Sequence, residues 1–204
     1  MPTEEYVILG SGGHAMVVLD ACQCAYPDAN LEVRDDDPAK ANAILLGVAI
    51  RTPIAPALGR RCHAAVGDNA VRRRLGEAVL QAGGILAPVV HPAALVSRHA
   101  AIESGAFIAA AAVVAPQARI GRGAIVNHGA VVDHDCEVGA WTHIAPGAVL
   151  GGAASVGEGC LIGSGAVLMP GVRVAVGATI GSGAVVTRDV AAGAVVTGVP
   201  GRVK

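Results

Sequence analysis

The residues best suited to chemistry are concentrated in one segment, residues 126–143 (VNHGAVVDHDCEVGAWTH). This segment contains three of the seven histidines together with three carboxylates. His134 stands between Asp133 and Asp135, and a nearby negative charge favours the imidazolium that forms when histidine accepts a proton. The pattern therefore predicts a general base at His134, whereas His128 alone is typical of a solvated surface histidine.

These residues lie inside a repeat of six that runs from Val90 to about Val190. An aliphatic residue occurs at every sixth position, and a small residue follows it four positions later. The period is neither helical nor a simple strand alternation, and it indicates a parallel β-helix in which short strands wind into a prism. The aliphatic residue should point into the prism, and the small residue should turn the corner. We expect about eighteen residues per coil and about five to six coils.

Glycine beside a corner supplies backbone geometry that other residues resist. Such positions include Gly105, Gly123, Gly129, Gly147, Gly165 and Gly183. The repeat therefore predicts tight turns as well as short strands.

Residues 1–88 follow a different pattern, so we predict two units, residues 1–88 and 89–204. Apolar runs and amphipathic stretches alternate in the first unit, which predicts a small parallel α/β domain with about three strands. The expected strands are Tyr6–Leu9, Leu31–Arg34 and Cys62–Val66, with a weaker one near Ile44–Leu46 or Val48–Ile50, and the expected helices are Ala15–Ala25 and Ala70–Ala82. The predicted fold class is thus a Rossmann-like α/β domain followed by an all-β parallel β-helix.

Three unusual turns should meet at one edge of this sheet, because ligands of open α/β sheets lie at the carboxyl ends of the strands. The first turn carries Gly12, Gly13 and His14, the second Asp35 and Asp36, and the third Gly67, Asp68 and Asn69. Amides at a helix N-terminus can bind phosphate, and carboxylates can accept hydrogen bonds from a base or a ribose. The Gly-x-Gly-x-x-Ala spacing formally fits the dinucleotide fingerprint. So short a domain favours a single nucleotide, and a Gly-rich turn without a ligand is the alternative.

Composition excludes several classes of function. The net charge is −1 and aromatic residues make up 2% of the chain, so nucleic-acid binding is not expected. The basic runs Arg60–Arg61 and Arg72–Arg74 are typical of a solvated loop and helix face. Mean hydropathy is +0.56, yet no stretch of about 18 strongly apolar residues occurs, so no membrane insertion is expected. The acidic start MPTEE lacks the basic residues of a signal peptide, which predicts a cytoplasmic protein.

Neither the cysteines nor the histidines predict a metal site. The five cysteines are odd in number and form no CxxC pair, which disfavours a disulfide framework and a zinc site. Cys136 and Cys160 occupy small-residue positions of the repeat and should be buried corner residues, not nucleophiles. Carbonic anhydrases of the gamma class also use a prism and bind zinc with three histidines, but the spacing of His128, His134 and His143 does not resemble theirs.

Together these motifs resemble the sugar acetyltransferases of the PglD/NeuD type. The shared features are a Gly-x-Gly-Gly-His turn after the first strand, Asp-Asp after the second, a Val-Gly-Asp-Asn turn, an unbroken hexapeptide prism, and Asn…Asp-His-Asp-Cys…His. The resemblance covers essentially the whole chain and implies a left-handed β-helix behind a nucleotide-sugar-binding domain. Members of the family use acetyl-CoA as co-substrate in glycan biosynthesis. They N-acetylate aminosugars carried on a nucleotide or O-acetylate sialic acids.

The resemblance also implies roles for individual residues. His134 matches the general base, and Asp135 matches an acidic neighbour that is Glu in members acting on UDP-linked aminosugars. Contacts with acetyl-CoA are implied for Asn127, His143, Ser164 and Ser182. Contacts with the nucleotide sugar are implied for Gly12, Gly13, His14, Asp35, Asp36 and Gly67. One departure from some relatives is Ala70, which replaces an acidic residue.

We therefore expect acetyl-CoA-dependent N-acetylation of a nucleotide-linked aminosugar of the UDP-4-amino-sugar type, by direct transfer and without a metal. O-acetylation of a sialic acid or another sugar is the first alternative, and a non-catalytic oligomeric scaffold is the second. His134 and His143 are nine residues apart, half a coil, so they should point to opposite sides of one prism. One cleft can use both only if it lies between neighbouring prisms, which predicts a homotrimer. Flat prism faces lined with Ala and Gly would also suit close packing.

Overall fold

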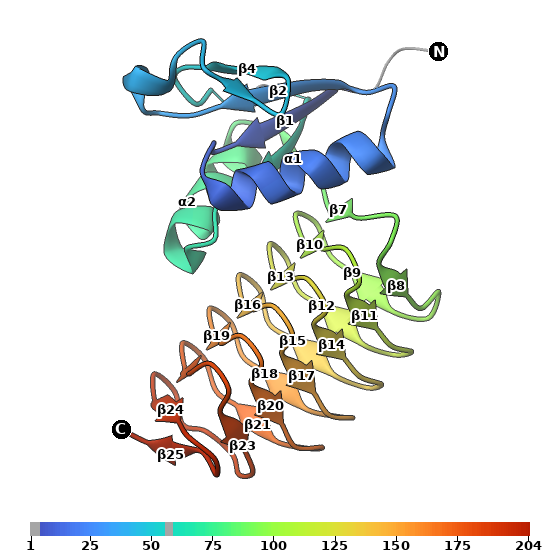
Figure 1. The fold of residues 1–204 in the computed structure, drawn as a ribbon, viewed down its shortest axis with the longest axis vertical. Helices are drawn as coiled ribbons and strands as arrows, with labels where there is room; N and C mark the ends of the chain where they lie inside the picture. The colour runs from blue at the N-terminus through green and yellow to red at the C-terminus, as the bar shows by residue number, and fades with distance from the viewer. Residues whose placement is uncertain (1–4, 56–58) are drawn as a thin grey trace. The chain divides into compact units, whose positions relative to one another are not determined.

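The computed structural model describes residues 5–55 and 59–204. The chain divides into two compact units, Met1–Pro92 and Ala93–Lys204 (Figure 1). Most of the N-terminal segment considered for a signal peptide, residues 1–4, lies outside the described part of the chain. Among the described residues, no helix is both long and apolar enough to cross a lipid bilayer.

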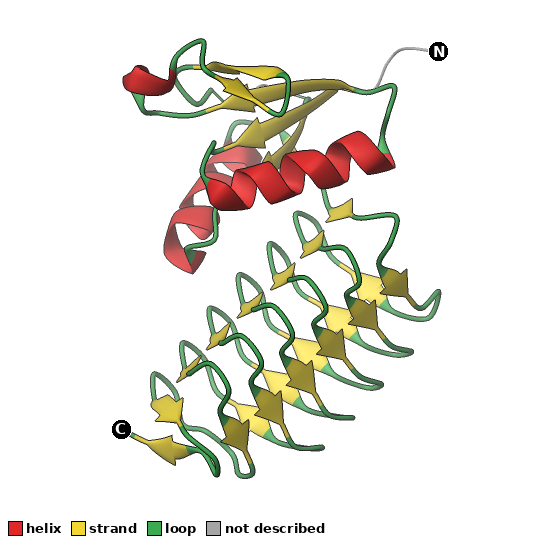
Figure 2. Cartoon of the chain, in the orientation of Figure 1, coloured by secondary structure: helices red, strands yellow, loops and turns green. Residues whose placement is uncertain are grey.

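Figure 2 shows the strands of the first unit in yellow and its helices in red. Six of these strands form a sheet with the order β3-β4-β2-β1-β5-β6. The strands are β1 (Glu5–Leu9), β2 (Asn30–Arg34), β3 (Ile44–Leu45), β4 (Val48–Arg51), β5 (Arg61–Ala64) and β6 (Ile85–Leu86). Neighbouring strands are parallel except in the β3–β4 hairpin. The expectation of about three strands was therefore wrong. Two-residue strands such as β3 and β6 are too short to show a pattern of their own, and only pairing with their neighbours defines them.

Two α-helices follow two of the three strands that carry the unusual turns. Helix α1 (Gly13–Ala25) connects β1 to β2, and α2 (Asn69–Gln81) connects β5 to β6. Strand β1 lies at the centre of the sheet, and its last four residues are at most 1% exposed. Because β1, β2 and β5 run parallel, the turns that follow them emerge at the same edge of the sheet.

The second unit is a prism of short strands stacked in three parallel sheets. The β13 face contains β10 (Phe107–Ile108), β13 (Ile125–Val126), β16 (His143–Ile144), β19 (Leu161–Ile162), β22 (Thr179–Ile180) and β24 (Val195–Thr197). The β14 face contains β8 (Leu95–Val96), β11 (Val113–Val114), β14 (Val131–Val132), β17 (Val149–Leu150), β20 (Val167–Leu168) and β23 (Val185–Val186). The β15 face contains β9 (Ala101–Ile102), β12 (Arg119–Ile120), β15 (Glu137–Val138), β18 (Ser155–Val156) and β21 (Arg173–Val174). Strand β7 (Val89–Val90) belongs to the first unit, and β25 (Arg202–Val203) pairs antiparallel with β24.

Register and burial confirm the predicted repeat. Val131 pairs with Val149, so each coil takes eighteen residues. The inward aliphatic residues of the central coils, such as Ile120 and Ile144, are fully buried, and so is the small residue Ala130. Cys136 and Cys160 are also fully buried, as expected for corner residues. The fold class is therefore the predicted one, an α/β unit followed by a parallel β-helix.

The turn that precedes each small residue is left-handed along most of the prism. Every sixth residue from position 105 to position 183 has a positive φ, and all six predicted glycines belong to this column. Five of its residues are not glycine: Ala111, Gln117, Asp135, Trp141 and Ala153. A side chain in this conformation costs about 1–2 kcal/mol, so the hydrogen bonds of the coil must hold it. The Asp135 amide, for example, donates to the carbonyl of Pro116 in the preceding coil at 3.2 Å.

The outward surfaces of the prism differ from the expectation of Ala- and Gly-lined faces. The β14 face presents a column of half-buried valines at Val113, Val131, Val149, Val167 and Val185. The β15 face presents charged residues, including Arg119, Glu137 and Arg173. Ala and Gly are abundant because the corners require them, so composition alone did not show which residues line the faces.

Two glycines of the left-handed column provide a matched test of packing between coils. Gly123 and Gly129 have φ values of 61° and 63°. A Cβ at Gly123 would overlap the ring of Trp141, whereas a Cβ at Gly129 would meet nothing within 4 Å. We expect Gly129→Ala to cost about 1–2 kcal/mol of folding free energy for the backbone alone. Gly123→Ala should cost clearly more.

The unfolding temperatures of the two variants would be compared by differential scanning fluorimetry and by the emission of Trp141, the single tryptophan of the chain. Equal losses of stability in the two variants would contradict the role given to the Trp141 contact.

Candidate functional site

The three predicted turns of the first unit are brought together at the carboxyl ends of β1, β2 and β5. The Ser11 hydroxyl donates a hydrogen bond of 2.5 Å to Asp35 Oδ2, which joins the first turn to the second. A Cβ placed on Gly67 would lie 4.0 Å from the Cβ of His14, so the third turn adjoins the first. Glycine is required at Gly10, where φ is 109° and a Cβ would approach Val66 to 3.0 Å.

The N-terminus of α1 is open at this edge. Gly12 is the N-cap, no side chain caps the helix, and its first turn contains no acidic residue. The first amides of a helix have no intrahelical partner and carry the positive end of its dipole, a combination that suits an anion. His14 lies in the same turn and is half-buried. The geometry is therefore suited to a phosphate group.

Asp35 is engaged by the protein itself. Besides Ser11, it accepts hydrogen bonds from the Asp37 amide at 2.9 Å and from Lys40 Nζ at 3.1 Å. Burial by itself would raise the pKa of Asp35, but the hydrogen bonds from Ser11, Asp37 and Lys40 outweigh it and lower the pKa below its usual value. Asp35 therefore holds the loop after β2 against the Gly-rich turn as an ionised carboxylate. Ser11 and Lys40 were not singled out in the sequence, because their role depends on this tertiary contact.

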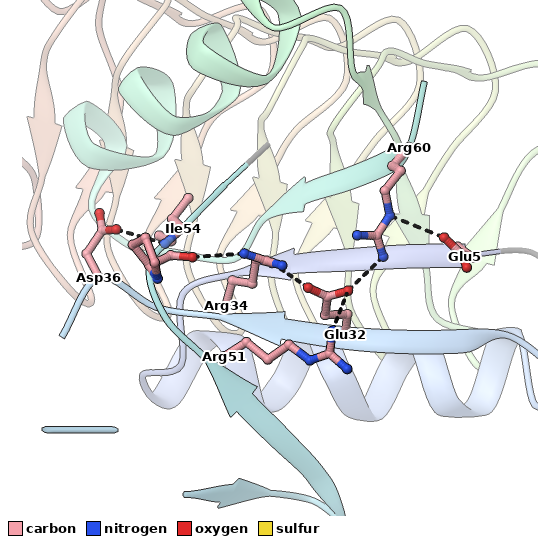
Figure 3. A network of polar contacts seen from close by, with 8 residues as sticks. Glu5, Glu32, Arg34, Asp36, Arg51, Ile54 and Arg60 are labelled. Carbon is pink, nitrogen blue, oxygen red and sulfur yellow. Dashed lines mark hydrogen bonds and ion pairs between the residues drawn. The ribbon is translucent and has the colours of Figure 1, made fainter. Parts of the chain in front are cut away.

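Asp36 is more exposed than Asp35. Its Oδ1 accepts a hydrogen bond of 2.9 Å from the Ile54 amide, as Figure 3 shows. That contact occupies one carboxylate oxygen and orients the side chain. Asp36 is therefore better placed than Asp35 to accept hydrogen bonds from a ligand.

A buried carboxylate, Glu32 on β2, is the centre of a network of charged side chains on the same sheet (Figure 3). Glu32 is 9% exposed, and its carboxylate contacts Arg34, Arg60 at 2.8 Å and Arg51 at 3.9 Å. Arg60 also pairs with Glu5 at 3.2 Å. Burial would raise the pKa of Glu32, but hydrogen bonds from Arg60 and Arg34 outweigh burial and lower it. The expectation that Arg60 is simply solvated was wrong, because β2 places a carboxylate beside it.

Arg72 is a second correction to the surface expected for the basic runs. It is 1% exposed, and its guanidinium donates to the carbonyls of Val66 and Gly67 at 3.1 and 3.0 Å and to Asn69 Oδ1 at 2.7 Å. Burial lowers the pKa of Arg72 to about 10. The Arg72 side chain thus holds the third turn in place. The run of three arginines in the sequence gave no sign that its first member would be buried.

The prism carries its chemical groups on corners. His134 follows β14 and lies at the corner between the β14 and β15 faces. Its Nδ1 lies 2.8 Å from Asp135 Oδ2, and its backbone amide donates to Asp133 Oδ1 at 2.7 Å. The side chains of His134 and Asp135 are 60% and 59% exposed. An ionised Asp135 makes Nδ1 the protonated nitrogen, so Nε2 is free to accept a proton.

The pKa of His134 is raised. The hydrogen bond with Asp135 is the main cause, and the charge of Asp133 adds to it. A raised pKa makes the imidazole a stronger base, which is the behaviour expected of a proton acceptor. The pair that the sequence predicted for general-base work is thus brought together by the corner.

The remaining predicted prism residues gather at the preceding corner and on the β13 face. Asn127 Nδ2 lies 3.1 Å from His143 Nε2. Ser164 and Ser182 are exposed and occupy the same corner position in adjacent coils, joined by a 2.9 Å hydrogen bond from the Gly183 amide to the Ser164 carbonyl. His134 lies one corner further on and has no described contact with this group, so one prism does not assemble both groups into a single cleft.

The cysteine nearest in sequence to His134 does not contribute its thiol to this arrangement, and one candidate metal site lies elsewhere among the described residues. The Cys136 thiol points inward, with Sγ 3.2 Å from the Gly151 carbonyl, and burial raises its pKa. One trio in the described part of the chain could hold a metal ion: Asp20, Cys24 and His91, whose ligand atoms lie within 4.8 Å of one another. None of them was predicted to do chemistry.

Comparison with known protein families assigns both halves of the chain. Residues 5–79 match the PglD N-terminal domain, and residues 117–152 and 153–188 match the bacterial transferase hexapeptide, six repeats. A search of curated proteins found no match.

Solved structures resemble the whole chain. A histidine-to-asparagine mutant of perosamine N-acetyltransferase from Caulobacter crescentus, in complex with CoA and GDP-perosamine, is 35% identical with a TM-score of 0.92, over 98% of this chain and 96% of that one. The acetyltransferase domain of PglB from Neisseria gonorrhoeae, in complex with acetyl coenzyme A, is 33% identical with a TM-score of 0.91, over 99% and 100%. WeeI from Acinetobacter baumannii, at 24% identity and a TM-score of 0.90 over 99% and 100%, shares the fold.

The contact between His134 and Asp135 predicts how the imidazole titrates. Asp135→Asn removes the carboxylate that is the main cause of the raised pKa, so the pKa of His134 should fall and the ring should stay neutral to lower pH. Asp133→Asn should lower the pKa less, because its charge is the smaller contribution. Titration of the imidazole followed by ¹H–¹⁵N NMR measures both effects, with the His128 resonances as internal reference. An unchanged or higher pKa of His134 in Asp135→Asn would contradict the geometry.

Proposed function

This chain belongs to the hexapeptide-repeat sugar acetyltransferases of the PglD type, and we propose that it transfers the acetyl group of acetyl-CoA to the amine of a nucleotide-linked aminosugar. It is an acetyl-CoA-dependent acyltransferase, so a purely non-catalytic scaffold is set aside. One observation carries the choice of acceptor. The similarity to perosamine N-acetyltransferase, solved with both CoA and a nucleotide sugar, extends over both units of the chain.

The proposed reaction is a direct transfer with His134 as general base. The amine nitrogen attacks the thioester carbonyl, the C–S bond breaks, and CoA leaves as the thiolate. The proton lost by the amine passes to His134 Nε2, because Nδ1 is held by Asp135 at 2.8 Å. Asp135 keeps the ring in this tautomer and stabilises the imidazolium. The buried Cys136, with its raised pKa, is unsuited to form an acyl-enzyme.

The first unit is proposed to hold the nucleotide sugar. Gly12, Gly13 and His14 provide the anion-binding end, and Gly67 leaves room beside His14. The exposed carboxylate of Asp36 is suited to the NH and OH groups of a nucleoside. Asp35, already bonded to Ser11 and Lys40, keeps the two loops together.

The identity of the nucleotide is the finer part of the proposal. The resemblance in sequence favours a UDP-linked 4-amino sugar, whereas perosamine N-acetyltransferase was solved with a GDP-linked sugar. Measuring kcat/KM for UDP- and GDP-linked 4-amino sugars side by side, by release of CoA thiol, distinguishes these two substrates. A sialic acid belongs in the same panel as the acceptor for O-acetylation.

Acetyl-CoA is proposed to bind beside Asn127, His143, Ser164 and Ser182, in a cleft between two prisms of a homotrimer. His134 lies at a different corner from this group, which supports a cleft built from two chains. The valine column of the β14 face, centred on Val149, provides apolar surface for close packing of subunits.

His134→Ala should lower kcat by about 10²- to 10⁴-fold and leave the KM for acetyl-CoA little changed, because the base acts mainly in the transition state. Steady-state kinetics with both substrates varied would test this. Wild-type turnover by the variant, or an acetylated Cys136 trapped by mass spectrometry, would contradict direct transfer by this base.

His14→Ala and Asp36→Ala should raise the KM for the nucleotide sugar and leave the KM for acetyl-CoA unchanged, because both residues belong to the first unit. The same assay should show little activity on the free aminosugar. If the sugar without its nucleotide reacts with equal kcat/KM, the first unit does not select the acceptor, and O-acetylation of a sialic acid becomes the better proposal.

Mixing two variants that each lack one of these histidines tests whether the cleft is shared between chains. If each site uses His134 of one chain and His143 of its neighbour, co-expressed His134→Ala and His143→Ala chains should rebuild about a quarter of the sites in a randomly mixed ring. Sedimentation gives the oligomeric state of the mixture, and the CoA-release assay gives its activity. A fully active monomer, or no recovery of activity in a mixed trimer, would contradict the shared cleft.

A further inference from the structure

Gly152 lies directly beneath the imidazole of His134. A Cβ built on Gly152 would lie 2.5 Å from His134 Nε2 and 2.6 Å from Cε1. Carbon atoms in van der Waals contact are about 3.5–4.0 Å apart, so the ring already occupies the space that a side chain would need. The Ala153 amide donates to the His134 carbonyl at 2.9 Å, and this bond between coils holds the two residues in register.

The backbone does not require glycine at this position. Gly152 is absent from the residues with positive φ, whereas its neighbour Ala153 adopts a φ of 57° with a side chain. The same corner position holds Arg98, Pro116, His134, Pro170 and Arg188 in other coils, so this part of the turn accepts side chains, including proline. Gly152 therefore lacks a side chain because the His134 ring lies against it, and not because the turn requires glycine.

Burial leads to the same conclusion. Pro116, His134, Pro170 and Arg188 are all exposed, whereas Gly152 is buried. His134 itself points outward from a corner with a 60% exposed side chain. The ring therefore lies along the prism edge toward the next coil, with Nε2 2.5 Å from the place that a Cβ of residue 152 would take.

We propose that Gly152 is a positioning residue that provides the flat surface on which the His134 imidazole rests, an inference that depends on the proposed role of His134 as general base. Asp135 holds one side of the ring through Nδ1, and Gly152 leaves room for the other side. The nitrogen that accepts the proton is thus kept at a fixed place on the corner. A methyl group at position 152 would turn the ring away from Asp135 or cover Nε2, and either change would misplace the base.

The test adds that methyl group. Gly152→Ala should lower kcat by about 10- to 100-fold, the loss typical of a misplaced catalytic group. The KM for the nucleotide sugar should stay unchanged, because the first unit is untouched. The imidazole resonances of His134 should shift in ¹H–¹⁵N NMR spectra. Arg188→Ala, at the same corner position two coils away, should leave kcat unchanged.

A double-mutant cycle separates this role from a general need for glycine. Without the ring, the added methyl group fits. The double variant His134→Ala/Gly152→Ala should therefore have the same unfolding temperature as His134→Ala, and its residual rate should agree within about twofold. A further loss of unfolding temperature in the double variant, equal to the loss caused by Gly152→Ala alone, would show a backbone role and overturn the proposal.

Failure of the base assignment is distinguishable from failure of this inference. Wild-type turnover by His134→Ala would overturn the proposed function. Wild-type turnover and unchanged His134 resonances in Gly152→Ala would overturn only the positioning role of Gly152.

Discussion

The stacking of identical positions eighteen residues apart is the constraint on which the prism and its chemistry depend. Backbone hydrogen bonds such as Val131 N to Ala148 O, at 2.8 Å, fix this spacing along each face. A corner residue therefore lies beside the residue eighteen positions away, on the adjacent coil. Gly123 beneath Trp141 and Gly152 beneath His134 are two examples of this relation. In each case a large ring on one coil is possible because the adjacent coil has no side chain there.

The same geometry explains why His134, the proposed base, is exposed. The interior of the prism is filled by aliphatic and small side chains, and its buried polar group Thr142 is satisfied by donating to the Gly157 carbonyl at 2.7 Å and accepting from the Cys160 amide at 3.0 Å. A titratable group inside would lose its hydration without a partner. The outward corner instead lets His134 keep a charged partner, Asp135, and remain open to solvent. A single prism leaves that corner unenclosed, which is consistent with a cleft completed by a neighbouring chain.

In the first unit, side-chain contacts hold the glycine-rich and acidic loops in place. Ser11, Asp35 and Lys40 connect the first two turns, and Arg72 holds the third through three hydrogen bonds. These partly buried, charge-assisted contacts replace the regular hydrogen bonds that loops lack. They leave Asp36 and the amides of α1 as the groups with capacity for a ligand.

The sequence by itself determined the prism, the eighteen-residue coil, its tight corners and the pairing of His134 with Asp135. These features are local or periodic, and each coil repeats the same physical requirement of aliphatic core and tight corner. The tertiary structure alone decided which residues lie beneath or beside one another. It placed Gly152 under His134, it buried Arg72 and Glu32, and it replaced the expected Ala and Gly of the faces with valines and charges. The sequence alone does not show whether a glycine or an arginine faces water or a neighbouring coil, because its environment is set by residues distant along the chain.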